Sequence, residues 1–138
     1  MANVMIVQVE QIGPTVSRGT ARGHTVHIDR PVAKEGTDQG AMGGELLLLS
    51  LGGCFMSNLL AAIRARSAEV SNVRLVVEGT LESAPPRYSA IVMKIEADYS
   101  DRALMEKLLT ISERGCIVAN TLKLAIPLSI ELAVRPDR

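Results

Sequence analysis

The sequence predicts an α+β fold, in which antiparallel sheets pack against a long, buried central helix. Two central stretches alternate apolar and polar residues, which is typical of half-buried strands. A long stretch before them is apolar on nearly all sides, which is typical of a buried helix. The expected elements follow the order βββ–α–ββ–α–α–β. Because helices and strands are segregated along the chain, the pattern favours α+β over a parallel α/β fold.

The first part of the chain is predicted to form strands and a glycine-rich loop. Val4 to Ile12 alternates loosely and is expected to be a strand, with a turn at Gly13-Pro14. Thr15 to Ile28 is a plausible hairpin partner, since its apolar residues stand among small and polar ones. Pro31 to Gly44 carries four glycines and mixed charges, which predicts a loop.

The middle of the chain is predicted to form the central helix and a hairpin. The helix is expected from about Glu45 to Ser67, buried by sheets or by another subunit. Val73 to Leu81 and Arg87 to Tyr99 are the two alternating stretches, and Ala84-Pro85-Pro86 between them predicts a turn.

The last part is predicted to hold two helices and a strand. Ser100-Asp101 is a helix-capping pair before an amphipathic helix from Arg102 to Glu113. Cys116 is expected to begin a short helical piece that runs to about Lys123. Ile126 to Val134 is predicted to be a final strand.

Length and composition indicate one domain, residues 1–138, large enough to bury its own core. Lys plus Arg and Asp plus Glu both number 15, and aromatic residues make up only 2% of the chain. This composition gives no basic patch or stacking platform, so we expect no nucleic-acid binding. Because aromatic residues are so scarce, oligomerisation is one way to enlarge the buried core.

Neither a membrane span nor a signal peptide is expected. The apolar run from Leu46 to Ile63 is interrupted by glycine, serine and asparagine. The N-terminal MANVMIVQVEQIG lacks a basic region and an adequate apolar core. A cytoplasmic location is therefore the default expectation. There, two cysteines favour a catalytic, metal-binding or inert role over a permanent disulfide.

The two cysteines are the main candidates for chemistry. Cys54 follows two glycines inside the central helix, where each glycine costs about 1 kcal/mol relative to alanine. Such a cost is usually offset by the close approach of another backbone or of a ligand. Cys116 stands at a helix start, where the dipole and free N–H groups favour a thiolate, and Arg114 adds positive charge. Either cysteine alone could be a small core residue, so a redox pair and coincidence both remain open.

The run GGELLLLSLGGCFMSNLLA and the later run RGCIVANTLK together resemble the OsmC/Ohr family of thiol peroxidases, OsmC-like subgroup. The resemblance implies an α+β fold built as an intertwined homodimer, with the central helices at the interface. It implies reduction of organic hydroperoxides, or of hydrogen peroxide, in oxidative-stress defence. Cys54 would form a sulfenic acid, and Cys116 would resolve it as a disulfide. No cofactor is expected; the reductant would be an external dithiol or thiol, such as a dihydrolipoyl group on a lipoylated protein.

The first departure from the family pattern concerns its activating glutamate, whose position is Gly44 in this chain. The nearby carboxylate, Glu45, precedes Cys54 by nine positions. Nine steps of about 100° turn a helix by about 900°, which puts Glu45 and Cys54 on opposite faces. We therefore interpret Glu45 mainly as a residue that stabilises the helix N-terminus, and keep it as a candidate site residue.

The second departure is Ile117, where better-characterised members have proline. The family's arginine comes from the first hairpin, which here offers Arg18 and Arg22. Arg22 is slightly favoured because it precedes the second β-type stretch, although a solvated hairpin charge is an equally acceptable interpretation. His24 and His27 lack partners at ligand spacing, so no metal site is expected.

Two alternatives to a peroxidase remain open. A non-catalytic dimeric member could bind a small apolar ligand or act as a scaffold, and the missing glutamate at Gly44 favours this reading. A thiol-dependent enzyme with a substrate other than peroxide is the second alternative.

Overall fold

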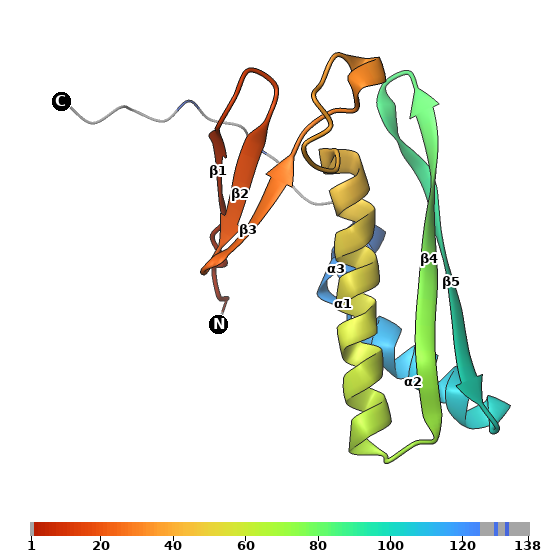
Figure 1. Ribbon diagram of the computed structural model, residues 1–138. Helices are drawn as coiled ribbons and strands as arrows, with labels where there is room; N and C mark the ends of the chain where they lie inside the picture. Colours follow the sequence, from red (N-terminus) through yellow and green to blue (C-terminus); the bar gives the residue numbers. More distant parts are fainter. Residues whose placement is uncertain (1, 125–128, 130–131, 133–138) are drawn as a thin grey trace. The chain divides into compact units, whose positions relative to one another are not determined.

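The computed structural model describes residues 2–124, 129 and 132, and it confirms the predicted α+β class (Figure 1). Antiparallel strands form two sheets, and one long helix runs between the strands in sequence. The chain divides into two compact units, Met1–Gly52 with Leu75–Lys94 and Gly53–Arg74 with Ile95–Arg138. The long helix and the second sheet each contribute residues to both units.

The first sheet lies in the first unit and has the order β1-β2-β3. Its strands are β1 (Gln8–Gln11), β2 (Ser17–Ala21) and β3 (His24–Ile28), all antiparallel. The stretch that we expected to be a single hairpin partner is thus two strands. The chain reverses at Arg22, whose φ of 62° lies in the left-handed region, followed by Gly23. The first strand is also shorter than expected.

A single carboxylate organises the loop that follows β3, which we call the Asp29 loop (residues 29–42). Asp29 is only 3% exposed. Its oxygens accept hydrogen bonds from the N–H groups of Arg30 (2.7 Å), Thr37 (3.2 Å) and Gln39 (3.1 Å), and from the Thr37 hydroxyl (2.5 Å). These donors, the Thr37 hydroxyl first, hold the pKa of Asp29 far below its usual value. The loop also contains a short 3-10 helix, η1 (Val32–Lys34).

The central helix α1 (Gly43–Ala65) starts two residues before the expected boundary. Glu45 in its first turn accepts the N–H of Met42 through Oε1 (2.9 Å). Buried apolar residues recur every three or four positions along α1, which makes one buried stripe. These residues are Leu51, Phe55, Leu59 and Ala62.

The remaining faces of α1 are not covered as the sequence led us to expect. Leu49 is 62% exposed and Leu60 is 47% exposed. Among the described residues, α1 is the one helix long and apolar enough to cross a membrane. Only 28% of its most apolar window is buried. Core helices of soluble proteins meet the same criteria, so this is weak evidence for a span.

The second sheet is the predicted hairpin of β4 (Val70–Ser83) and β5 (Pro86–Tyr99). The alternation is confirmed, because Val73, Leu75 and Val77 are half-buried while the residues between them are exposed. In the first unit, a Cβ placed on Gly52 would lie 2.9 Å from Leu75 Cδ1. The helix glycine therefore permits close approach of the strand.

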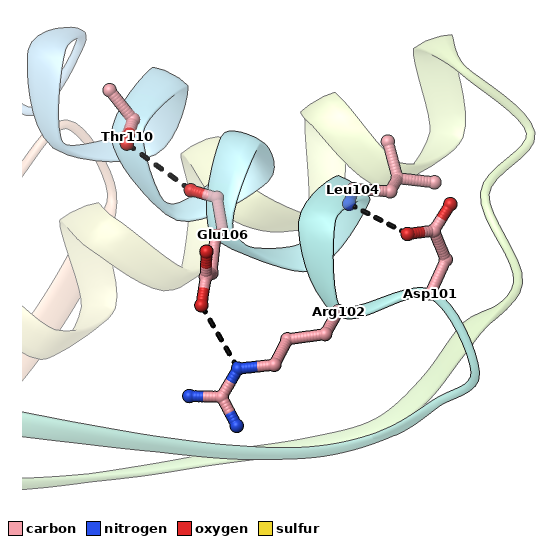
Figure 2. A network of polar contacts seen from close by, with 5 residues as sticks. All are labelled: Asp101, Arg102, Leu104, Glu106 and Thr110. Carbon is pink, nitrogen blue, oxygen red and sulfur yellow. Dashed lines mark hydrogen bonds and ion pairs between the residues drawn. The ribbon is translucent and has the colours of Figure 1, made fainter.

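Helix α2 (Arg102–Arg114) begins where the sequence predicts, and Figure 2 shows the contacts that stabilise it. Asp101 caps the helix by accepting the N–H of Leu104 (3.0 Å). Arg102 Nε pairs with Glu106 Oε1 one turn later (3.0 Å), and the Thr110 hydroxyl donates to the Glu106 carbonyl (3.2 Å). These contacts lie on exposed side chains, while the opposite side of α2 is buried.

The last described helix of the second unit is α3 (Ile117–Lys123), the predicted short helix. Its N-cap residue is Cys116, which follows the C-cap Gly115 of α2. The predicted final strand, Ile126 to Val134, lies outside the described residues apart from two isolated positions.

Candidate functional site

Both cysteines lie in the second unit, where α1 meets the junction of α2 and α3. We call this junction, residues 111–120, the α2–α3 corner. Cys54 is half-buried and comes from α1, while Cys116 is fully buried at the N-cap of α3. Both are reduced. The fold thus brings together two thiols that are far apart in the sequence.

Three groups of the corner act on the Cys54 sulfur and favour its thiolate. They are the backbone N–H of Val118, the thiol of Cys116 and the backbone N–H of Ile117. Burial by itself would raise the pKa of Cys54, but these groups favour the thiolate and lower the pKa below its usual value. Among the described residues, no arginine or lysine is a cause of this shift.

Cys116 behaves in the opposite way. Burial raises the pKa of this thiol, and the adjacent Cys54 sulfur raises it further. The N–H of Ala119 donates to Cys116 Sγ (3.4 Å) and lowers the pKa, but not enough to reverse the net shift. Our expectation that the start of α3 favours a thiolate at Cys116 is therefore wrong. The N–H groups of Ile117 and Val118 at the start of α3 lower the pKa of Cys54, and that of Val118 acts on Cys116 as well.

The geometry of the corner follows from the way that the end of α2 satisfies its carbonyl groups. A helix leaves its last four carbonyls without partners inside the helix. Here each finds a donor: Ile111 O from Gly115 N (3.2 Å), Ser112 O from Asn58 Nδ2 (3.3 Å), Glu113 O from Cys116 N (3.1 Å) and Arg114 O from Asn120 Nδ2 (3.1 Å). Three donors come from the corner itself, and one comes from α1.

The other predicted site residues belong to the first unit. Arg18 pairs with Glu10 on the neighbouring strand (2.5 Å between Nη2 and Oε1). Arg22 is exposed in the turn between β2 and β3, and Glu45 is engaged at the start of α1. Their catalytic assignments stay predictions.

Position 44, where the family glutamate would stand, is shaped by Tyr88. The Tyr88 hydroxyl donates to the Gly44 carbonyl (2.8 Å). A Cβ placed on Gly44 would lie 3.1 Å from that hydroxyl oxygen, which is tighter than most contacts of a real Cβ. The tyrosine and the glycine thus fit each other.

Neither a metal centre nor a second thiol site emerges among the described residues. No group of three His, Cys, Asp or Glu side chains could hold a metal ion there. A cavity of about 480 Å³ in the first unit is lined by Arg30, Lys34 and the start of α1. It contains no cysteine.

Sequence reasoning missed two residues of the site, Asn58 on α1 and Ser112 in the corner. Asn58 was the only clear signal available, because a carboxamide one turn after Cys54 is out of place in so apolar a helix. Ser112 contributes through its backbone carbonyl, and its buried hydroxyl bonds within α2 (2.7 Å to Leu108 O). Every residue has a backbone carbonyl, so the identity of residue 112 gives no sign of this hydrogen bond.

Comparisons with known proteins agree on the family. A family model described as OsmC-like protein matches residues 36–131. No curated protein matches the sequence. Solved structures similar to this chain include a hypothetical protein from Aquifex aeolicus, with a TM-score of 0.75 and 19% identity over 88% of this chain and 89% of the other.

Two further structures have informative names. An OsmC-like protein from Mycoplasma pneumoniae has a TM-score of 0.71 and 14% identity, over 89% of each chain. The organic hydroperoxide resistance protein OhrB of Bacillus subtilis has a TM-score of 0.60 and 14% identity, over 88% of this chain and 91% of the other. At these identities the likeness shows a shared fold.

Proposed function

Because the chain belongs to the family of OsmC-like proteins, we propose that it is a cysteine-based peroxidase that reduces organic hydroperoxides, with hydrogen peroxide as a second candidate substrate. The observation that carries the proposal is the contact between Cys54 and the α2–α3 corner. The pKa of Cys54 is lowered, and the thiol of Cys116 is one of the groups that lower it. A reactive thiolate beside a resolving thiol is the arrangement that peroxide reduction needs.

In the proposed reaction the Cys54 thiolate attacks the terminal oxygen of the hydroperoxide. The O–O bond breaks, Cys54 becomes a sulfenic acid, and the alkoxide takes up a proton and leaves as the alcohol. Cys116 then attacks the Cys54 sulfur, an S–S bond forms, and the sulfenic oxygen leaves as water. In total, two thiols and one hydroperoxide give a disulfide, an alcohol and water.

The raised pKa of Cys116 suits the first step, in which Cys54 alone attacks the peroxide; in the second step Cys116 loses its proton, which leaves with the sulfenic oxygen as water. A thiol that stays protonated does not compete for the peroxide, and it donates its proton toward the Cys54 sulfur. Regeneration requires an external dithiol or thiol, for which a dihydrolipoyl group on a lipoylated protein or a small thiol is the proposed donor. A cytoplasmic location and a role in oxidative-stress defence complete the proposal.

We include a homodimer in the proposal. Apolar side chains on α1 are left uncovered, among them Leu49 at 62% and Leu60 at 47% exposure. Exposed apolar surface of this kind is stabilised when a second copy covers it. The catalytic assignments of Arg18, Arg22 and Glu45 also belong to the proposal, with Arg22 or Arg18 as the cation and Glu45 as the carboxylate.

A second candidate function rests on Gly44. A chain without the family glutamate could be a non-catalytic dimer that binds a small apolar ligand. The close fit of Tyr88 at Gly44 favours this alternative, because it leaves little room for a carboxylate side chain.

The deciding experiment is a thiol titration before and after one equivalent of cumene hydroperoxide. The peroxidase predicts the loss of two free thiols per chain, and Cys54→Ser should abolish that loss. In Cys116→Ala the sulfenic acid at Cys54 should accumulate and be detected by mass as a dimedone adduct. Unchanged thiols in the wild-type protein would exclude the peroxidase and support the binding protein.

A further inference from the structure

We infer that Asn58 is the positioning residue that sets Cys116 against Cys54, which makes the disulfide step depend on this carboxamide. The inference deepens the proposed function and rests on it. It starts from the hydrogen bond between Asn58 Nδ2 and the Ser112 carbonyl, at 3.3 Å.

Asn58 lies on the same side of α1 as Cys54. The two residues are four positions apart, so they are neighbours one turn apart along the helix. The hydrogen bond of Asn58 therefore fixes the end of α2 at a point close to the reactive sulfur. Asn58 is part-buried and Ser112 is fully buried, and a buried carbonyl that loses its donor is costly.

The same carboxamide also lies close to the turn that leads into α3. A Cβ placed on Gly115 would lie 3.4 Å from Asn58 Nδ2, so the amide reaches the residue just before Cys116. Gly115 and Cys116 in turn donate to α2 carbonyls through their backbone N–H groups. Because these bonds tie Gly115 and Cys116 to Ile111 and Glu113, the residues on either side of Ser112, a shift at Ser112 is passed to Cys116.

Among the four carbonyls at the end of α2, only that of Ser112 takes its donor from α1. The other three are satisfied within the corner and keep its shape. Asn58 thus sets the position of the corner on α1, while the corner's own hydrogen bonds set its internal geometry.

Two measurable properties depend on that position. The first is the effective concentration of Cys116 at Cys54, which decides how readily the two sulfurs form a disulfide. The second is the thiolate fraction of Cys54, because the N–H groups of Ile117 and Val118 in the same corner lower the pKa of this thiol. A corner that is no longer held in place weakens both.

The test uses Asn58→Leu, which removes the donor and preserves the approximate volume of the side chain. Thr110→Val is the matched control, because it also removes one side-chain donor to an α2 carbonyl, on an exposed part of the helix. Far-UV circular dichroism establishes that each variant is folded. If Asn58→Leu does not fold, Asn58→Ser takes its place, since its side chain ends one bond short of the amide nitrogen.

The first readout is disulfide formation in glutathione buffers. Glutathione disulfide oxidises the two thiols, so one protein disulfide forms and two glutathione thiols are released. We expect Asn58→Leu to lower this equilibrium constant about fivefold, the effect of one lost hydrogen bond, with no change in Thr110→Val. The second readout is the pH dependence of Cys54 alkylation, whose midpoint should move to higher pH in Asn58→Leu alone.

An equilibrium constant and an alkylation midpoint in Asn58→Leu equal to those of the wild type would overturn the inference. Equal shifts in Thr110→Val would also overturn it, because they would reveal a general loss of stability. Neither readout uses peroxide. A wild-type protein that forms the disulfide with glutathione but not with cumene hydroperoxide would refute the peroxidase and leave the role of Asn58 intact.

Discussion

The Asp29 loop and the α2–α3 corner hold irregular backbone in place by opposite means. In the Asp29 loop one buried carboxylate accepts hydrogen bonds from N–H groups and a hydroxyl. In the α2–α3 corner two backbone carbonyls accept from carboxamides, one from Asn58 on α1 and one from Asn120 within the corner. The Asp29 carboxylate therefore gives partners to backbone N–H donors, whereas the two carboxamides give partners to backbone carbonyl acceptors.

This difference explains why one of the two regions suits thiolate chemistry. At the corner the side-chain amides of Asn58 and Asn120 donate to two of the α2 carbonyls. The backbone N–H groups of Ile117 and Val118 stabilise a negative sulfur at Cys54. In the Asp29 loop the donors already serve a permanent negative charge. A carboxylate in place of Asn58 would repel both the carbonyl and the thiolate.

The largest expected effect concerns the two thiols of the corner. At pH 7, iodoacetamide should modify Cys54 at least about tenfold faster than Cys116, because the Cys54 pKa is lowered and Cys116 is buried with a raised pKa. Timed alkylation followed by peptide mass spectrometry measures both rates. Equal alkylation rates would mean that the surroundings of Cys54 and Cys116 do not make the two thiols differ in reactivity.

The next effect is on the Asp29 loop. Asp29→Ala removes the acceptor of four hydrogen bonds and leaves their donors without a partner, so we expect the melting temperature to fall by roughly 5 °C or more. Differential scanning fluorimetry gives the shift. Lys34→Ala, on the same loop and without a described hydrogen bond of its side chain, serves as the control and should change little.

A smaller effect is the acid sensitivity of the same loop. The pKa of Asp29 is lower in the folded protein than its usual value of 3.8, so the charge stabilises the fold at higher pH. That stabilisation is complete well above pH 3.8 and is lost as the pH falls through and below this value. Urea midpoints measured between pH 6 and 3 should therefore fall more steeply in the wild type than in Asp29→Asn. Parallel curves would contradict the assignment.

The smallest effect is expected for Asn120→Ala at the corner. Its carboxamide is exposed, so water can replace its hydrogen bond to the Arg114 carbonyl. We expect a loss of about 0.5 kcal/mol in the free energy of unfolding, measured by urea denaturation, and a smaller change in disulfide formation than in Asn58→Leu. A larger effect than that of Asn58→Leu would mean that Asn120 on α3, and not Asn58 on α1, is the main support of the corner.

The regular elements could be predicted because their patterns are strong. The alternation around Val73 and Ile91 predicted the hairpin, and Asp101 marked the start of α2 to within one residue. The division of the second strand could not be predicted, since Arg22 adopts a left-handed conformation that its residue type does not favour.

The candidate site was only partly visible in the sequence. The pair of cysteines was singled out from the sequence and the resemblance supplied their expected roles, but the pKa direction expected for Cys116 was wrong because burial outweighed the helix N-terminus. Asp29 was not singled out, because its importance comes from donors up to ten positions away. Tertiary hydrogen bonds of this kind are set by the fold and leave no periodic signal.

The fit of Tyr88 at Gly44 has a practical consequence for protein engineering. The two positions constitute a single design variable: installing an acidic side chain at 44 alone would push against the phenol, whereas a double replacement that also shortens residue 88 would open the space. Libraries that aim to recover the missing glutamate should therefore randomise both codons together.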